Sequence, residues 1–182
     1  EKYRARNISF RWYCYPHSLP VDLESRLHSL GPTRIHEMAG LYADVKGFPI
    51  KAYSDVRVEE VNDLNIDDYI KASNAGWGQT GAAAEKVKAS IYSDFKNPNR
   101  GYSSFVAWYK GEPASTGMLR LIDSETGYLL GGSTSPNFRG KGVYSALVSH
   151  RIEHLKKMSV NQALVFARKS TSAPICQKLG FL

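Results

Sequence analysis

The chain has 182 residues, of which 42% are hydrophobic, and its formal net charge is +7. This length and apolar content fit one globular core with a small appendage and argue against disorder. No apolar run reaches the length of a membrane span, so we expect no membrane association. Cys14 and Cys176 lie far apart in a chain without a secretory leader pattern. We therefore expect a reducing compartment, the cytoplasm, rather than a disulfide framework.

The positive charge suits a nucleic acid, an acidic surface or a phosphorylated ligand, and by itself it does not choose among them. Lysines and arginines are scattered along the chain, and no zinc-finger spacing or aromatic ribonucleoprotein motif accompanies them. A solvated basic surface is the simpler interpretation. A basic nucleic-acid-binding protein therefore stays as the least favoured alternative.

The beginning of the chain predicts a small strand–helix–strand unit. Residues 8–15 are rich in aromatic side chains and strand-like, residues 22–30 follow as a helix, and residues 34–45 form a second strand. This unit is too small to hold a core alone. We assign residues 1–46 to it and residues 47–55 to a linker.

Residues 56–182 predict a mixed α/β domain. A strand and two helices are followed by a three-stranded meander with tight turns, and then by a helix, a strand and a helix. A short strand that follows a helix indicates a crossover to a parallel neighbour, so the sheet is mixed and mostly antiparallel. The expected strands cover 56–61, 104–109, 114–122, 128–134 and 163–167, and the expected helices cover 65–74, 82–95, 142–158 and 171–179.

A glycine turn, SPNFRGKGV at residues 135–143, separates the last strand of the meander from the next helix. Pro136 prevents the strand from continuing, and Gly140 and Gly142 allow unusual backbone torsions. Successive amides then point at one spot that the helix dipole reinforces, an arrangement that binds phosphate. The spacing fits neither a Walker loop nor the three-glycine dinucleotide fingerprint. A plain strand-to-helix turn is the alternative, and it leaves the cations of Arg139 and Lys141 unexplained.

The following helix contains HRIEH at residues 150–154, which matches the H-x-x-E-H string of inverted zinc peptidases. His150 lies outside the apolar stripe of the helix and His154 lies at its edge, so we expect both to face water, and no third ligand is evident. Two surface histidines are favoured over a metal site. Arg151 projects into the middle of the apolar stripe, where a cation needs a partner or a ligand.

The turn resembles the acetyl-CoA signature of the GCN5-related N-acetyltransferase family, in which Arg/Gln-x-x-Gly-x-Gly/Ala follows the fourth strand. ARKSTSAP at 167–174 and QKLGF at 177–181 are similar to that family's later motif of strand, polar turn, helix and terminal Leu-Gly-Phe. The element order also matches over residues 56–182. The resemblance implies an acyl-CoA N-acyltransferase fold with a V-shaped split between the fourth and fifth strands of the domain.

The resemblance further implies that acetyl-CoA is the cofactor, with pantetheine along the fourth strand and the pyrophosphate on the glycine turn. An amine then attacks the thioester directly in a ternary complex, so the protein is expected to be an N-acetyltransferase. Backbone amides hold the pyrophosphate, so the glycines matter more than the charge of Lys141. The expected cofactor-binding residues are Gly132, Ser133, Thr134, Arg139, Gly140, Lys141, Gly142, Val143, Tyr144 and Ser172.

Three features depart from the family pattern. Tyr144 stands where the family prefers glycine or alanine, and it either crowds the cofactor or packs beneath the sheet. Cys176 replaces the tyrosine that is the family's frequent general acid; a thiol with a pKa near 8.5 is able to protonate a thiolate, so Cys176 is the candidate catalytic residue. A small buried cysteine is the alternative. The fourth strand carries no carboxylate base, which keeps a non-catalytic CoA-binding or regulatory module as the second hypothesis.

The acceptor is expected to be a small amine or an amino-acid-like molecule, and the loop of the first helix pair carries no acidic cluster that would signal a polyamine. In such folds the first helix pair shapes the acceptor pocket, so the candidate substrate-binding residues are Asn74, Trp77, Gln79 and Tyr92. Trp77 either stacks on a ligand or plugs the junction between the helices.

Residues 27–31, LHSLG, echo residues 176–180, CQKLG, so the first unit looks like the end of a degenerate earlier copy of the domain. Its last strand would be 34–45, whereas the second copy reaches Leu182 before any such strand. Either a tail beyond Leu182 is missing or a strand of the first unit covers that sheet edge, and we favour the missing tail. An uncovered edge would invite pairing into a homodimer.

Overall fold

The computed structural model describes residues 12–31 and 35–182. The chain divides into two compact units, one up to His36 and one from Glu37 to Leu182. In the first unit, α1 (Leu23–Ser29) confirms the predicted helix, and none of its residues is buried. The predicted strand at 8–15 lies partly outside the described residues, and residues 12–15 are not in a strand.

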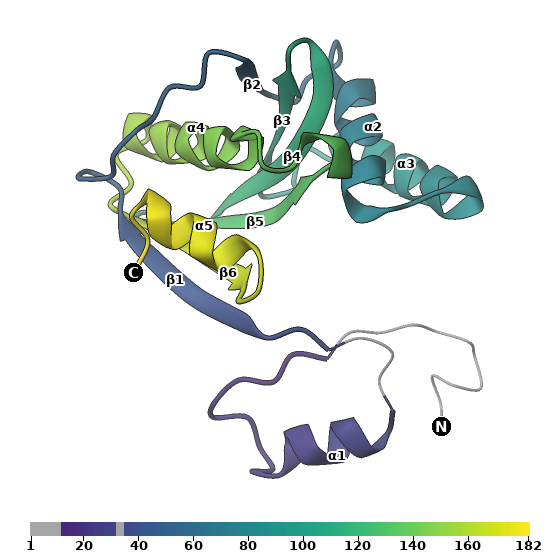
Figure 1. Ribbon diagram of the computed structural model, residues 1–182, viewed down its shortest axis with the longest axis vertical. Helices are drawn as coiled ribbons and strands as arrows, with labels where there is room; N and C mark the ends of the chain where they lie inside the picture. The colour runs from purple at the N-terminus through teal and green to yellow at the C-terminus, as the bar shows by residue number, and fades with distance from the viewer. Residues whose placement is uncertain (1–11, 32–34) are drawn as a thin grey trace. The chain divides into compact units, whose positions relative to one another are not determined.

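The second unit is built on a six-stranded sheet with the order β1-β6-β5-β4-β3-β2 in the part of the chain that the structure describes (Figure 1). β5 and β6 are parallel, and every other neighbouring pair is antiparallel. This confirms the predicted mixed, mostly antiparallel α/β fold. The strands are β1 (Met38–Asp44), β2 (Val56–Glu60), β3 (Ser103–Tyr109), β4 (Glu112–Leu121), β5 (Thr126–Thr134) and β6 (Gln162–Arg168); the helices are α2 (Ile66–Trp77), α3 (Gly81–Phe95), η1 (Pro136–Phe138), α4 (Val143–Lys157) and α5 (Ser172–Leu179).

Helices cover both faces of the sheet (Figure 1). Successive side chains of a strand point to opposite faces, and in β3 Phe105 joins the core beneath α4 and α5, while Val106 joins the cluster beneath α2 and α3. The tight turn predicted between β3 and β4 is also present, with positive φ angles at Lys110 and Gly111 (49° and 87°) that suit a two-residue hairpin. None of the described helices combines the length and the hydropathy that crossing a membrane requires.

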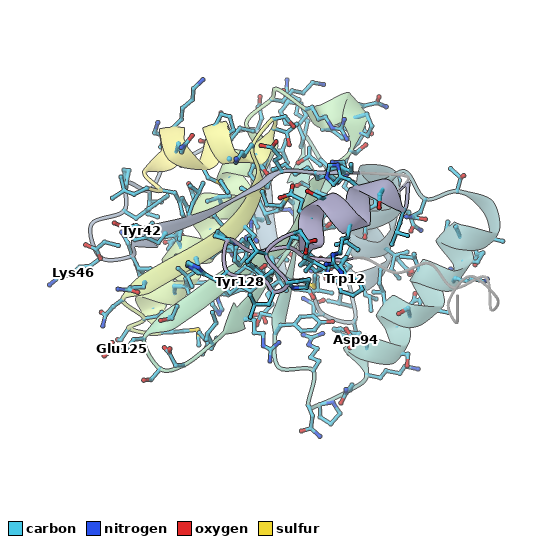
Figure 2. All side chains as sticks on the ribbon, turned by 90° about the horizontal axis from the view of Figure 1, so that it is seen from below. Trp12, Tyr42, Lys46, Asp94, Glu125 and Tyr128 are labelled. Atoms are coloured by element: carbon cyan, nitrogen blue, oxygen red, sulfur yellow. The ribbon has the colours of Figure 1, made fainter. Side chains whose placement is uncertain are left out.

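β1 corrects the expected arrangement at the edge of the sheet. It pairs antiparallel with β6 along its whole length, from Met38 opposite Arg168 to Asp44 opposite Gln162. The edge of β6 is therefore covered from the N-terminal side, and the expectation that it awaits a strand from beyond Leu182 is wrong. Leu182 instead exchanges two backbone hydrogen bonds, of 2.8 and 3.0 Å, with Tyr42, which lies on β1 (Figure 2).

The boundary between the units also differs from the predicted one. The larger unit begins at Glu37 rather than at residue 56. Within the predicted linker, Phe48 is buried and its ring meets the ring of Phe181 edge-on, with centroids 5.3 Å apart. Gly47 and Pro49 suggest a loop, but the aromatic side chain between them belongs to the core.

Candidate functional site

The sheet opens between β5 and β6. These strands pair in parallel from Thr126 opposite Gln162 as far as Leu129 opposite Val165. β5 then continues to Thr134 and β6 to Arg168, and no pairing joins them within the described structure. This is the V-shaped split that the resemblance implied, and it exposes the backbone edge of residues 130–134.

A buried arginine lies at the base of this split. Arg151 donates from Nη1 to the carbonyl oxygens of Met118 (3.0 Å) and Leu130 (3.4 Å), and from Nε to that of Leu147 (3.2 Å). Its side chain is 1% exposed, and none of the described carboxylates forms an ion pair with it. Pairing between β4 and β5 shifts register between Thr116 and Met118, so the guanidinium satisfies carbonyls near a β-bulge. Its predicted position in the apolar stripe is confirmed.

The glycine turn connects the open end of β5 to α4. Gly140 and Gly142 have φ angles of 75° and 78°, the left-handed region that glycine adopts readily. The first amides of α4 have no acceptor within the helix. A Cβ at Gly140 would meet no atom within 4 Å, whereas one at Gly142 would come within 2.9 Å of Tyr53. Open space at Gly140 beside free helix amides fits the pyrophosphate of acetyl-CoA, because the amides face an unobstructed approach.

The two cations of the turn contact the protein itself. Nε of Arg139 donates to the carbonyl of Thr134 (3.2 Å), which ties the turn to the end of β5. Nζ of Lys141 lies 5.1 Å from the ring centroid of Tyr109 and 5.4 Å from that of Phe138. These contacts give both cations a local role in holding the turn.

Several side chains expected at the cofactor are engaged elsewhere. Oγ of Ser133 lies 3.1 Å from Oγ1 of Thr116, and Oγ1 of Thr134 lies 2.9 Å from Oγ of Ser115. Oγ of Ser172 accepts a hydrogen bond from the amide of Arg168 (2.9 Å). The carbonyl oxygens of the two strand residues are engaged as well, that of Ser133 by Oγ of Ser115 (2.6 Å) and that of Thr134 by Nε of Arg139 (3.2 Å).

Tyr144 and Cys176 meet beneath the split. The tyrosine hydroxyl lies 3.8 Å from Sγ of Cys176, and a Cβ at Gly132 would come within 2.9 Å of the tyrosine ring. Tyr144 thus packs beneath the sheet, the second of the two positions considered for it. Burial raises the pKa of Tyr144 well above its usual value, and the nearby Cys176 adds to this while the charge of Arg151 opposes it. Burial also raises the pKa of the Cys176 thiol, against the influence of Tyr144 and Arg151.

A cavity of about 400 Å³ lies on the other face of the sheet, between α2, α3 and β3 to β5. Of the four candidate substrate-binding residues, Trp77 and Gln79 line it. Asn74 and Tyr92 do not: Nδ2 of Asn74 donates to the carbonyl of Ala84 (3.5 Å), and the hydroxyl of Tyr92 donates to Asp67. The cavity lining is Val61, Tyr69, Ser73, Trp77, Gln79, Val87, Ser90, Ile91, Asp94, Phe95, Arg100, Tyr102, Ser104, Met118 and Gly131.

Two charged residues of this cavity were missed from the sequence. Asp94 lies near the C-terminal end of α3 (Figure 2), and Arg100 lies in the following loop, with its guanidinium carbon 5.1 Å from the ring centroid of Phe95. Burial raises the pKa of Tyr69 in the same cavity; a hydrogen bond with Ser104 lowers it, Asp94 raises it and Arg100 lowers it. In the sequence, a helix end followed by Asn97-Pro98 indicated only a loop. Nothing in this segment predicted that the charges of Asp94 and Arg100 would lie in a cavity that reaches β5.

The HRIEH segment has a different environment from the one expected. The rings of His150 and His154 both meet the buried ring of Phe105 edge-on, at centroid distances of 5.6 and 5.4 Å. The expectation that they simply face water is wrong, because α4 lies across β3. Among the described residues, no group of three or more histidine, cysteine or acidic side chains is arranged to hold a metal ion.

Comparison with known proteins gives the family of this fold. Residues 59–181 match the model of the Acetyltransferase (GNAT) family. The match spans more than half of the chain, so the chain belongs to this family of acetyltransferases. No curated protein matches the sequence significantly.

Solved structures share the fold at low sequence identity. A functionally unknown conserved protein from Staphylococcus epidermidis aligns with a TM-score of 0.74 at 18% identity, over 93% of this chain and 66% of that one. A GCN5-related N-acetyltransferase from Kribbella flavida aligns with a TM-score of 0.59 at 16% identity, over 88% of this chain and 60% of that one. AAC(6')-Iy, in complex with the bisubstrate analogue CoA-S-monomethyl-acetylneamine, aligns with a TM-score of 0.54 at 17% identity, over 71% of this chain and 92% of that one. The chain therefore spans about two thirds or less of the first two proteins.

Proposed function

We propose that this chain transfers the acetyl group of acetyl-CoA to the primary amine of a small, amino-acid-like acceptor. The observation that carries the proposal is the cavity of about 400 Å³, which holds one carboxylate and one guanidinium and meets the sheet at Gly131. Gly131 directly precedes the strand segment 132–134, whose backbone edge is open along the split. An acceptor in this cavity would present its amine at the split.

The charges in the cavity favour an acceptor that carries both an amine and an acidic group. The carboxylate of Asp94 suits an ammonium group, and the guanidinium of Arg100 suits a carboxylate or a phosphate, because charge-assisted hydrogen bonds are the strong ones. Trp77, Phe95 and Tyr102 supply aromatic walls. The volume limits the acceptor to a small molecule.

The cofactor would be held mainly by the backbone. When bound, acetyl-CoA supplies an activated thioester. The amides of residues 140–144 would bind the pyrophosphate, and the backbone of Gly132, Ser133 and Thr134 would bind the pantetheine. Arg139 would fix the end of β5 against the turn. β5 carries no carboxylate, so water would remove the proton from the amine.

The test measures thiol release from acetyl-CoA with three matched acceptors: an amino acid, the same molecule without its carboxylate, and the same molecule with a blocked amine. We expect release with the first, weaker release with the second, and none with the third. Arg100→Gln should raise the KM of the first acceptor by about ten to a hundredfold and leave the second unchanged. Lys96→Gln is the matched control, because Lys96 is exposed and does not line the cavity.

Each negative result points to a different protein. Stabilisation by CoA without thiol release from any amine would indicate the non-catalytic CoA-binding module. If CoA gave no stabilisation, the cofactor proposal would fail, and steeply salt-dependent binding of DNA or RNA would then favour the basic nucleic-acid-binding protein.

A further inference from the structure

Two residues that depart from the family pattern lie against each other. Tyr144 in the first turn of α4 replaces a small residue, and Cys176 in α5 replaces a tyrosine. Their side chains meet at 3.8 Å, hydroxyl to sulfur. The exchange therefore leaves a phenol at this place, supplied by α4 instead of α5.

The phenol lies beside the open edge of β5. The point where a Cβ of Gly132 would stand is 2.9 Å from Cε2 of Tyr144 and 3.6 Å from its hydroxyl oxygen. Any side chain at position 132 would occupy the space of the ring, so glycine is what lets Tyr144 reach the strand. Gly132 belongs to the segment along which the pantetheine is proposed to lie.

Burial separates the roles of the two side chains. Cys176 is 0% exposed and packs within the core cluster of α4, α5 and the sheet. Tyr144 is only partly buried. A group must touch the departing sulfur to act on it, so the partly exposed Tyr144 is the better candidate of the two.

Burial keeps the phenol protonated, and a nearby cation favours an anion next to it. Burial and Cys176 raise the pKa of Tyr144, so its hydroxyl stays a donor at neutral pH. Arg151, from the same helix, is the cation that acts on both Tyr144 and Cys176. A fully buried guanidinium that donates to three backbone carbonyls places positive charge beneath the split.

We propose that the Tyr144 hydroxyl donates a hydrogen bond to the sulfur that leaves during acetyl transfer, that Arg151 positions and electrostatically supports it, and that Cys176 serves packing. The acceptor nitrogen forms a bond to the acetyl carbon, and the carbon–sulfur bond breaks with its electron pair going to sulfur. The amine passes one proton to water, and the thiolate later takes one from water. Tyr144 stabilises the charge developing on sulfur and keeps its own proton. The inference rests on the proposed function.

The first test requires no acceptor. The thiol of CoA bound to the protein is titrated by thiolate absorbance, with the protein bound to desulfo-CoA as the reference for its own thiols. A hydrogen bond to the thiolate lowers the pKa of the thiol, so Tyr144→Phe should raise the pKa of the bound thiol by about one unit relative to wild type. The matched control Tyr42→Phe, which removes an exposed hydroxyl on β1, should leave it unchanged. Equal thiol pKa values in wild type and Tyr144→Phe would overturn the inference.

The second test is turnover. Tyr144→Phe should lower kcat about a hundredfold with little change in CoA affinity, Cys176→Ala should lower it much less, and Tyr42→Phe, which removes an exposed hydroxyl on β1, should retain wild-type kcat. A loss in Cys176→Ala as large as in Tyr144→Phe would overturn the inference and restore Cys176 as the catalytic candidate. Melting temperature and CoA binding check that each variant is folded. If no amine is acetylated, the proposed function fails, while the titration still decides whether Tyr144 bonds to the sulfur.

Discussion

The hydroxyl of Tyr144 and the sulfur of Cys176 lie 3.8 Å apart, and this contact joins α4 to α5 beneath the open part of the sheet. A large side chain on one helix fills the space left by a small one on the other. Each residue alone departs from the family pattern, but together they conserve the volume of a phenol at this place. The pair is thus one packing solution and not two independent changes.

This relationship predicts non-additive stability. Cys176 is 0% exposed, so Cys176→Tyr should overpack its site and lower the free energy of unfolding by about 1–3 kcal/mol. Tyr144→Ala should leave a cavity and lower it by about 2–4 kcal/mol. In the double variant the new phenol refills the cavity, so its loss should be smaller than the sum by more than about 1 kcal/mol. Denaturant unfolding of the four proteins measures this. Additive losses would show that the two side chains do not share one space.

The glycine turn predicts how CoA affinity responds to charge. Gly140→Asp should weaken CoA binding at least about tenfold relative to Gly140→Ala, because both variants bear the same left-handed backbone and only one adds a negative charge. Calorimetric titration with CoA gives the two affinities. Equal affinities would mean that the pyrophosphate does not lie at residue 140. Gly142 is a poorer probe, since any side chain there meets Tyr53.

His150 predicts a loss of stability on the acid side. Burial lowers the pKa of His150, with the positive groups nearby adding to the effect and Glu153 opposing it. The unfolded state then binds a proton at a pH where folded His150 stays neutral. The contribution of His150 to stability is therefore present above the ordinary histidine pKa of about 6.5, and it is lost as pH falls toward the lower pKa that His150 has in the folded state. In His150→Gln, the free energy of unfolding should depend less on pH across this window. An unchanged slope in the variant would assign the acid sensitivity to another group.

The pairing of β1 with β6 predicts a sharp contrast between adjacent residues. Ala43 is 1% exposed and Tyr42 is 53% exposed, although both lie on β1. Ala43→Asp places a carboxylate in the core and should cost more than about 2 kcal/mol, while Tyr42→Asp should cost much less. Thermal or denaturant unfolding of the two variants decides the matter. Comparable losses would mean that β1 does not present Ala43 to the core.

Much of the fold was predictable because its determinants are local. The helices of the second unit follow from the spacing of apolar residues, and Gly180 ends α5 in a left-handed conformation as its position suggests. The burial of Arg151 follows from its place in the helical stripe. The glycine turn follows from residues that fix backbone torsion over a few positions, and the split beside it was implied by the resemblance to the family.

The candidate site itself was predicted only in part. Trp77 and Gln79 line the cavity, but Asp94 and Arg100 enter it from the end of a helix and from a loop whose sequence signals nothing beyond a turn. Asn74 and Tyr92 lie on the same helices, where Nδ2 of Asn74 bonds to the carbonyl of Ala84 and the hydroxyl of Tyr92 bonds to Asp67. The helical register places a residue on a face, and the packing of that face against a neighbour decides what the side chain touches.

By itself, the sequence determined the order of the elements, the mixed sheet and the position of the glycine turn, since each depends on periodicity or backbone torsion over short distances. Tertiary structure alone decided that β1 covers β6, because the sequence of a strand does not specify which strand it pairs with, and here the partner lies more than a hundred residues away. It also decided that Tyr144 and Cys176 fill one space. Contacts of this kind depend on how whole helices pack, and only the folded chain brings them together.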